Sequence, residues 1–499
     1  MASENARQHH IVLVPGFVGF DALGQIMYYA GVTDVFRRWS AEHRGVSIHY
    51  FDNYPTASVR LRAKRLLDYL TSRVARGEIR SGDSLALVGH STGGLDIRML
   101  VWQLAETLVS EPRQGTVVDG DTVVFHKEIL DLIDRVVFVS VPHFGTNLAD
   151  LASRYAPVFK ALAGDVATGL SFNQGFVGYL RSKVMDAREG QRSHLLLALL
   201  DALDESDENP RDLPEKQAKE RAARFELMTW LENMAHDFSS IEDLTSMGGD
   251  LRSPAHFTPA ERAREMDHWK NYEIRAHSFA TRVPRTRYDS PGAARSFVDH
   301  ARRWGPWVAR SARLLEREPA RAVVATPFAV VRELLELPLI PLVSPVLRSA
   351  RYAVFDILYA ACADPRGPFG STVRLRELAP SVRDFVSGST LPTVEISAAD
   401  NDGIVNTLSM LWPHALEITG EHPIDLVDAD HADILGHFAL EPVQDPGSTD
   451  RRHYAYNIFQ QPQFEFSAVT FKRVWPSIFD FCVSRGSTLE DRGVAARAV

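Results

Sequence analysis

The chain has 499 residues, of which 45% are hydrophobic and 24% charged, and its formal net charge at pH 7 is −9. These proportions are ordinary for a soluble globular protein, and the length allows one elaborated catalytic domain or two to three domains. The negative charge argues against nucleic acid as the main partner. With only two cysteines, Cys362 and Cys482, the chain has neither a disulfide framework nor a cysteine-based zinc cluster.

The amino-terminal residues 1–10 lead directly into the first expected strand, residues 11–14. They contain neither the apolar region nor the small-residue cleavage site of a secretory signal, so we expect a cytoplasmic protein. The strand ends at Pro15 and Gly16, which predict a tight loop. Three elements are expected next: a helix over 35–41, a strand over 46–51 and a helix over 58–74. This order indicates a parallel sheet with crossover helices.

The most informative stretch is residues 83–98, which read D-S-L-A-L-V-G-H-S-T-G-G-L-D-I-R. Residues 85–88 predict a strand buried on both faces, and the apolar spacing from Leu95 onward predicts a helix. Between them lies a G-x-S-x-G motif centred on Ser91, in the strand-to-helix context of a nucleophile elbow. The motif alone could be a glycine-rich turn of another α/β domain, but its flanking elements favour Ser91 as a nucleophile.

A further buried strand is expected at 135–140, and V-P-H-F-G-T-N-L-A-D follows it at 141–150. The chain resembles bacterial true lipases and esterases of the α/β-hydrolase fold in this stretch and in three others. These are V-P-G-F-V-G-F at 14–20, G-H-S-T-G-G at 89–94, and N-D-G-I-V at 401–405 paired with D-H-A-D-I-L-G at 430–436. Those lipases often have His-Gly where this chain has Pro15-Gly16. The motifs occur in the order Ser, Asp, His that the fold requires.

The resemblance implies an α/β-hydrolase core: a mainly parallel central sheet with crossover helices and a large, mostly helical inserted cap. We expect the core to comprise residues 1–150, a strand within 271–282 and residues 392–499. The cap would consist of two mostly helical insertions, 151–270 and 283–391.

Two segments of the expected cap have unusual composition. Residues 204–216 are charged and contain helix breakers, which predicts a solvated loop. Residues 337–347 form an uncharged run with three prolines, too short and too broken for a membrane span. That run either packs inside the cap, lines an acyl-binding groove or forms part of a lid.

The candidate acid of a triad follows an expected strand at 392–397. Asp400 and Asp402 compete for this role. The D-G-I-V match to the lipases favours Asp402, and Asp400 is then a residue that caps the loop.

The candidate base is His431, which directly follows the last expected strand, 424–427. His414, His422 and His437 are nearby alternatives, but none of them sits directly after a strand of the sheet. A histidine on such a loop, behind an elbow serine and an acid loop, is typical of a catalytic base.

Together these residues predict acyl transfer. His431 would accept the proton of Ser91, and Asp402 would orient its imidazole. As in the resembled family, backbone N–H groups of Phe17 and Thr92 would form the oxyanion hole. We expect a serine carboxylic ester hydrolase that cleaves lipid-like esters through an acyl-enzyme. The alternatives are an acyltransferase or thioesterase with the same triad, and a non-catalytic binding protein that keeps the fold.

This chemistry requires no cofactor. The resemblance implies a structural calcium with Asp433 and Asp445 as candidate ligands, although Asp445 lies at a larger spacing than in the family. We expect a lipid-like or other small ester as substrate and transient contact of the cap with a lipid surface. We expect no nucleic-acid partner and no transmembrane segment, and the sequence does not indicate an oligomeric state.

Overall fold

The computed structural model describes part of the chain. It covers residues 7–153, 237–245, 253–283, 299, 303, 353–364, 382–412, 423–437 and 468–484, without 18, 20, 21, 24, 25, 30, 119–121, 238, 391–395 and 398. The expected solvated loop at 204–216, the apolar run at 337–347 and most of the expected cap therefore lie outside the described residues.

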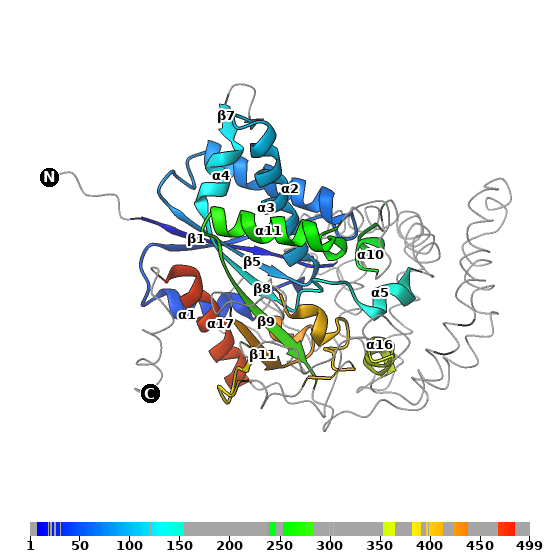
Figure 1. Cartoon of the computed structure of the whole chain (residues 1–499). Coiled ribbons are helices and arrows are strands. Elements are labelled where there is room, and N and C mark those ends of the chain that lie inside the picture. The colour runs from blue at the N-terminus through cyan, green and yellow to red at the C-terminus, as the bar shows by residue number, and fades with distance from the viewer. Residues whose placement is uncertain are drawn as a thin grey trace, which may run out of the picture.

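The centre of the structure is a sheet of seven parallel strands in the order β10-β11-β9-β8-β5-β1-β4 (Figure 1). The strands are β1 (His9–Val14), β4 (Val46–Tyr50), β5 (Ser84–His90), β8 (Ile133–Val139), β9 (Arg275–Arg282), β10 (Val382–Asp384) and β11 (Ile424–Asp428). The strands expected at 11–14, 46–51, 85–88 and 135–140, within 271–282 and at 424–427 are confirmed to within a few residues. Their short apolar runs are the pattern of strands buried on both faces.

Helices cover both faces of this sheet (Figure 1). One face carries α2 (Val59–Ala75), α3 (Thr92–Ser110), α4 (His126–Leu132) and α11 (Pro259–Asn271). The other carries α1 (Val32–Ser40) and α17 (Ala468–Val483). Short elements complete the described part: α5 (Asn147–Ala152), α10 (Ser239–Asp243), α16 (Ala353–Cys362), the 3-10 turns η2 (Pro254–His256), η4 (Thr407–Met410) and η5 (Asp433–Leu435), and the pairs β2–β3 (Ala22–Leu23, Ile26–Met27) and β6–β7 (Gly115–Val118, Thr122–Phe125). No helix among these elements is long and apolar enough to cross a membrane.

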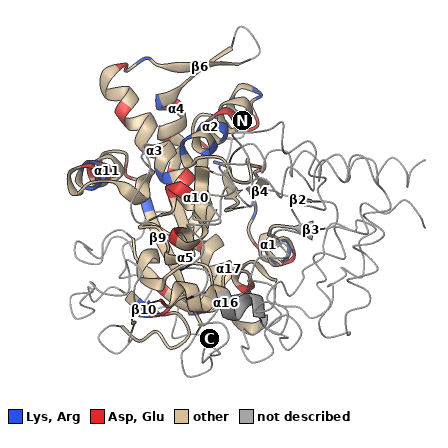
Figure 2. Cartoon of the chain, turned by 90° about the vertical axis from the view of Figure 1, so that its right-hand side faces the viewer, with Lys and Arg blue, Asp and Glu red and all other residues tan. Residues whose placement is uncertain are grey.

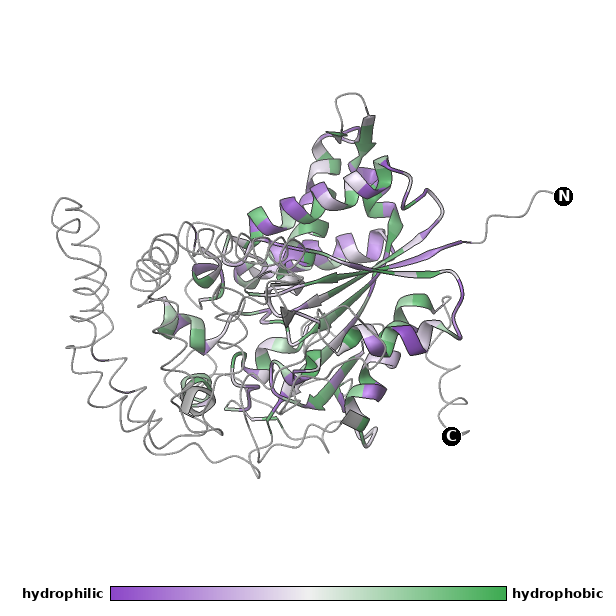
Figure 3. Cartoon of the chain, turned by 180° about the vertical axis from the view of Figure 1, so that it is seen from behind, coloured by the Kyte–Doolittle hydropathy of each residue, from purple (hydrophilic) through white to green (hydrophobic). Residues whose placement is uncertain are grey.

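Apolar side chains fill the spaces on both sides of the sheet. Leu66, Leu100 and Trp269 are fully buried or nearly so on the face of α2, α3 and α11. Trp475 and Phe479 of α17 are fully buried on the opposite face. The strands are mainly hydrophobic between the helical layers (Figure 3), and charged residues lie mostly on the helices, for example on α2 and α11 (Figure 2). This arrangement is the three-layer α/β architecture expected from the sequence, and its sheet order is that of an α/β-hydrolase core.

One expected strand is wrong in its described part. Residues 396 and 397, the end of the strand expected at 392–397, are not in a strand. Instead, the short β10 is the edge strand beside β11, although it falls inside the range 283–391 that we expected to be an insertion. A short run with apolar and β-branched residues cannot be distinguished from a sheet strand by its pattern alone, because pairing depends on distant partners.

The turn after β5 is so tightly packed that it constrains its glycines. A Cβ atom on Gly93 would lie 2.3 Å from the carbonyl oxygen of Val14 and 2.7 Å from that of Pro15. These contacts are with backbone atoms, so neither neighbour can move aside by a change of rotamer.

We therefore expect Gly93→Ala to lower the free energy of unfolding by about 3 kcal/mol or more, the upper range for overpacked sites. Gly77→Ala is the control, because a Cβ at Gly77 meets nothing within 4 Å and the position has only an unfavourable φ of +69°. That variant should lose about 1 kcal/mol. Urea unfolding of both variants measures the difference, and equal losses would contradict the packing argument.

Candidate active site

Ser91 occupies a strained turn between β5 and α3. Its φ is 53° and its ψ is −132°, values that an L-residue rarely adopts. Serine often begins a helix because its hydroxyl caps a free N–H, yet the Ser91 side chain makes no capping hydrogen bond. The backbone is held by a hydrogen bond from the Ser91 N–H to the Val139 carbonyl, 3.0 Å long. The Ser91 hydroxyl therefore does not stabilise the helix, although the backbone that carries it is strained.

The loop after β1 lies directly against this turn. A Cβ atom on Gly16 would lie 2.5 Å from the Cβ of Ser91, so only glycine fits there. The contact places Phe17 beside the turn. Thr92 is the first residue of α3, so its backbone N–H has no hydrogen-bond acceptor within the helix. Both proposed oxyanion donors therefore belong to segments that meet at Ser91.

A buried arginine fixes the orientation of this loop. Arg62 donates from Nη2 to the carbonyl oxygens of Pro15 and Gly16, each at 2.9 Å. In a trans peptide the C=O and the next N–H point in opposite directions, so the Phe17 N–H points away from Arg62.

The charge of Arg62 is balanced by Asp96. Arg62 Nε donates to the two carboxylate oxygens of Asp96 at 3.1 and 3.0 Å, and both side chains are fully buried. Burial raises the pKa of Asp96 to about 6, against the opposing effects of Arg62 and Asn53. The carboxylate therefore depends on its partner for its charge.

The structure brings Asp402 and His431 together. His431 Nδ1 lies 2.7 Å from Asp402 Oδ2, and the His431 N–H donates to the Asp402 carbonyl at 3.0 Å. Asp402 is fully buried, and its Oδ1 accepts the backbone N–H groups of Ile404 (3.0 Å) and Val405 (2.8 Å). A carboxylate at Nδ1 fixes the tautomer that leaves Nε2 able to accept a proton.

Asp400, the competing carboxylate, has different partners. Its oxygens accept the backbone N–H and the hydroxyl of Ser397, at 2.7 and 3.0 Å, and Arg282 lies 3.9 Å away. These contacts close the turn that precedes Asn401. Asp400 thus makes the loop-capping contacts considered for it from the sequence.

The acid loop is anchored to the end of β9. The hydroxyl of Thr281 donates to Asp402 Oδ2 at 2.7 Å, and the Val283 N–H donates to the Asn401 carbonyl at 2.9 Å. The chain thus leaves the sheet after β9 and returns to the same place more than a hundred residues later. Sequence reasoning missed Thr281, because nothing in its local pattern indicates a partner so far along the chain.

His431 contacts His90, the residue that precedes Ser91. The rings of His90 and His431 have centroids 4.6 Å apart, and His90 Nε2 lies 3.1 Å from the His431 carbonyl oxygen. Within the described residues no hydrogen bond joins the Ser91 hydroxyl to His431. Such contacts are often long without substrate. Among the alternative histidines, His437 is buried against the carbonyl of Tyr28 at 2.9 Å, and His414 and His422 lie outside the described residues.

The candidate calcium ligands are only partly visible. Asp433 is buried beside Asp430, whose Oδ1 accepts the N–H groups of Ala432 (2.9 Å) and Asp433 (2.7 Å). Burial raises the pKa of Asp433 above its usual range. In the described part of the chain no three His, Cys, Asp or Glu side chains are grouped to hold a metal ion. Asp445 lies outside that part, so calcium binding by Asp433 and Asp445 stays a prediction.

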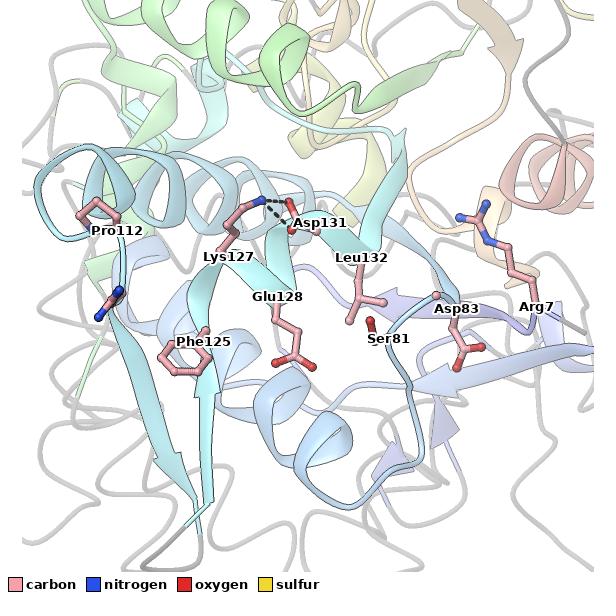
Figure 4. Close-up of a pocket in the computed structure, with 11 residues that line it drawn as sticks. Arg7, Ser81, Asp83, Pro112, Phe125, Lys127, Glu128, Asp131 and Leu132 are labelled. Carbon is pink, nitrogen blue, oxygen red and sulfur yellow. Dashed lines mark hydrogen bonds and ion pairs between the residues drawn. The ribbon is translucent and has the colours of Figure 1, made fainter. Parts of the chain in front are cut away.

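A cavity of about 790 Å³ lies away from Ser91 and His431, at the amino ends of the strands (Figure 4). It is lined by residues that precede β1, β5 and β8, namely Arg7, Asp83 and Leu132, and by Phe125 and Glu128. The 19-residue α3 begins directly after Ser91 and ends just before the cavity residue Pro112, a separation of about 28 Å along its axis. In this fold the reacting groups gather at the carboxyl ends of the strands, so this cavity is separate from the candidate site.

Comparison with known proteins gives fold-level likenesses at low identity. No family model and no curated protein matches the chain. Lipase 1 from Pelosinus fermentans is similar over 86% of this chain and 94% of its own, with 16% identity and a TM-score of 0.34. EstA from Clostridium botulinum is similar over 92% and 88%, with 13% identity and a TM-score of 0.35. A metagenomic carboxyl esterase is similar over 95% and 77%, with 12% identity and a TM-score of 0.29. Because these scores are low, the α/β-hydrolase assignment rests on the sheet order and on the turn at Ser91.

The buried pair of Arg62 and Asp96 gives a test of how the loop after β1 is held. We expect Arg62→Met to lower the free energy of unfolding by about 3–5 kcal/mol, because it leaves a buried carboxylate without its partner. Arg65→Met is the matched control on the same helix, since Arg65 pairs with the exposed Asp52. It should change stability by less than about 1 kcal/mol. Chemical denaturation measures both, and a loss in Arg62→Met no larger than the control would refute this role.

Proposed function

We propose that the protein is a serine carboxylic ester hydrolase that cleaves lipid-like esters through an acyl-enzyme on Ser91. The observation that carries the proposal is the 2.7 Å hydrogen bond between Asp402 and His431, in a loop that meets the strained turn of Ser91 through His90. A buried carboxylate, an imidazole and a serine that does not cap its helix all lie at the carboxyl ends of the strands, which are the groups that a serine hydrolase needs. The lipid-like class of ester follows from the resemblance of the motifs to lipases.

The chemistry follows from the roles of these groups. The Ser91 hydroxyl attacks the carbonyl carbon of the ester while His431 Nε2 takes its proton. The negative charge on the carbonyl oxygen is stabilised by the N–H groups of Phe17 and Thr92, each contributing about 3–4 kcal/mol in comparable sites. His431 then donates its proton to the departing alkoxide, and the acyl group remains on Ser91. A water molecule, deprotonated by His431, attacks the acyl-enzyme and releases the acid.

Asp402 acts on these reaction steps through His431. Its carboxylate accepts the Nδ1 proton and stabilises the imidazolium that forms in each step. The hydroxyl of Thr281 and two backbone N–H groups hold the carboxylate in place. These hydrogen bonds take the place of the solvent that an exposed carboxylate would have around it.

Replacement of the nucleophile is the first test. Ser91→Ala should lower kcat for p-nitrophenyl esters by at least about 10⁴-fold, because it removes the oxygen on which the acyl-enzyme forms. Activity is measured on a series from acetate to palmitate, with the thermal unfolding midpoint as the control for folding. A lipid-like preference predicts higher kcat/KM on longer chains. A Ser91→Ala variant that keeps more than a few per cent of the activity would refute the assignment.

The choice of acid is tested with a matched pair of variants. Asp402→Asn should lower kcat by about 10⁴-fold, because an amide favours the wrong imidazole tautomer. Asp400→Asn should change kcat by less than about tenfold, since its carboxylate contacts Ser397 instead of the imidazole. The same ester assay measures both variants. The reverse order would show that Asp400 is the acid.

A further inference from the structure

A chain of buried hydrogen bonds joins the loop after β1 to the loop of His431. The Gly16 N–H donates to the hydroxyl of Tyr28 at 2.8 Å, and this hydroxyl lies 2.6 Å from His90 Nδ1. His90 Nε2 lies 3.1 Å from the carbonyl oxygen of His431. Tyr28 and His90 are almost completely buried. Two loops about 400 residues apart in sequence are thus connected by two side chains.

The protons of this chain have only one consistent arrangement. The carbonyl of His431 can only accept, so His90 Nε2 carries the proton and Nδ1 is an acceptor. The Tyr28 hydroxyl therefore donates to Nδ1 while it accepts from Gly16. Burial lowers the pKa of His90 well below its usual range and raises that of Tyr28, so both groups keep these states at neutral pH.

The backbone around Tyr28 also contacts the His431 loop. His437 Nε2 lies 2.9 Å from the Tyr28 carbonyl oxygen, and the Gly31 N–H donates to the Leu435 carbonyl at 3.2 Å. A Cβ atom on Gly436 would lie 2.7 Å from the Cα of Gly31, so the two backbones are in close contact. Tyr28 thus belongs to a segment packed against one loop while its hydroxyl binds the other.

We propose that Tyr28 is a positioning residue that holds the oxyanion donor of Phe17 and the base His431 in register on either side of Ser91. This inference rests on the proposed ester hydrolysis. The tetrahedral intermediate needs both groups at once: one N–H at the oxyanion and one imidazole at the serine oxygen. Displacing a group by about 1 Å costs about 10²-fold in rate. The Gly16 peptide precedes Phe17 directly, and the His431 carbonyl belongs to the base itself, so the Tyr28 chain acts on both.

A purely structural role for the hydroxyl predicts a different result. Tyr29 offers the matched comparison, because its buried hydroxyl donates to the Val14 carbonyl at 2.7 Å and contacts the backbone of His90, whereas the Tyr28 hydroxyl binds the His90 imidazole and the Gly16 N–H. Tyr29→Phe removes one buried hydrogen bond from the same β1 strand end. If hydroxyls here serve only stability, Tyr28→Phe and Tyr29→Phe should behave alike.

The experiment compares wild type, Tyr28→Phe and Tyr29→Phe in the full chain. Three quantities are measured: kcat and KM for p-nitrophenyl butyrate, the inhibition constant of phenylboronic acid, which binds serine as a tetrahedral anion, and the thermal unfolding midpoint. We expect Tyr28→Phe to lower kcat by about 10- to 100-fold, to weaken the boronic acid by a similar factor and to change KM by less than about twofold. Tyr29→Phe should leave kcat and boronic acid binding within about threefold of wild type.

Equal effects of the two substitutions on kcat, or an unchanged kcat in Tyr28→Phe, would overturn the role of Tyr28 while leaving ester hydrolysis intact. A wild-type protein without turnover on any ester would instead contradict the proposed function. If Tyr28→Phe does not fold, His90→Gln interrupts the same chain, and the same loss of kcat at unchanged KM is expected. A His90→Gln variant with wild-type kcat would also overturn the proposal.

Discussion

The buried carboxylate of Asp402 is the contact on which the site depends. It receives hydrogen bonds from Thr281 at the end of β9, from its own loop and from His431 after β11. An ionised carboxylate without water is stable only when such donors surround it, so the three segments must meet for the fold to be complete. The same hydrogen bonds to Asp402 therefore stabilise the fold and orient the imidazole of His431 so that it can accept a proton. We infer that loss of any one donor disturbs both.

Much of the core could be predicted because its signals are local. Apolar runs marked the strands, and the glycines around Ser91 marked a turn that the structure shows to be crowded and strained. The motif match favoured Asp402 over Asp400, and Asp402 is the carboxylate at 2.7 Å from His431. The rest depends on distant contacts. Arg62, Tyr28 and Thr281 lie in ordinary helix, turn and strand sequence. The strand expected at 392–397 had a suitable pattern, although its described residues 396 and 397 are not in a strand. Local periodicity contains no information on which loop a side chain will reach.

The carboxyl ends and the amino ends of the strands differ in the polar contacts around them. At the carboxyl ends, buried polar groups pair across long sequence separations: Arg62 with Asp96, Tyr28 with His90, Asp402 with His431. The amino ends carry an open cavity with exposed ion pairs such as that of Lys127 with Asp131 (Figure 4). Exposed pairs contribute little to stability, whereas buried pairs are costly unless every group is satisfied. Some buried networks therefore lie where the proposed reaction needs rigid geometry, and others, such as His277 with Asp425 and Arg98 with Glu265, lie elsewhere in the core.

The central claim is that Ser91 is an activated nucleophile, and covalent labelling tests it most directly. Diethyl p-nitrophenyl phosphate should transfer one diethylphosphoryl group to the protein with release of nitrophenolate, because the phosphorus is attacked as an ester carbonyl would be. Peptide mass spectrometry of the native protein should locate that group on Ser91, and urea-unfolded protein should not react. Labelling at another residue, or no labelling of a folded protein, would contradict the account.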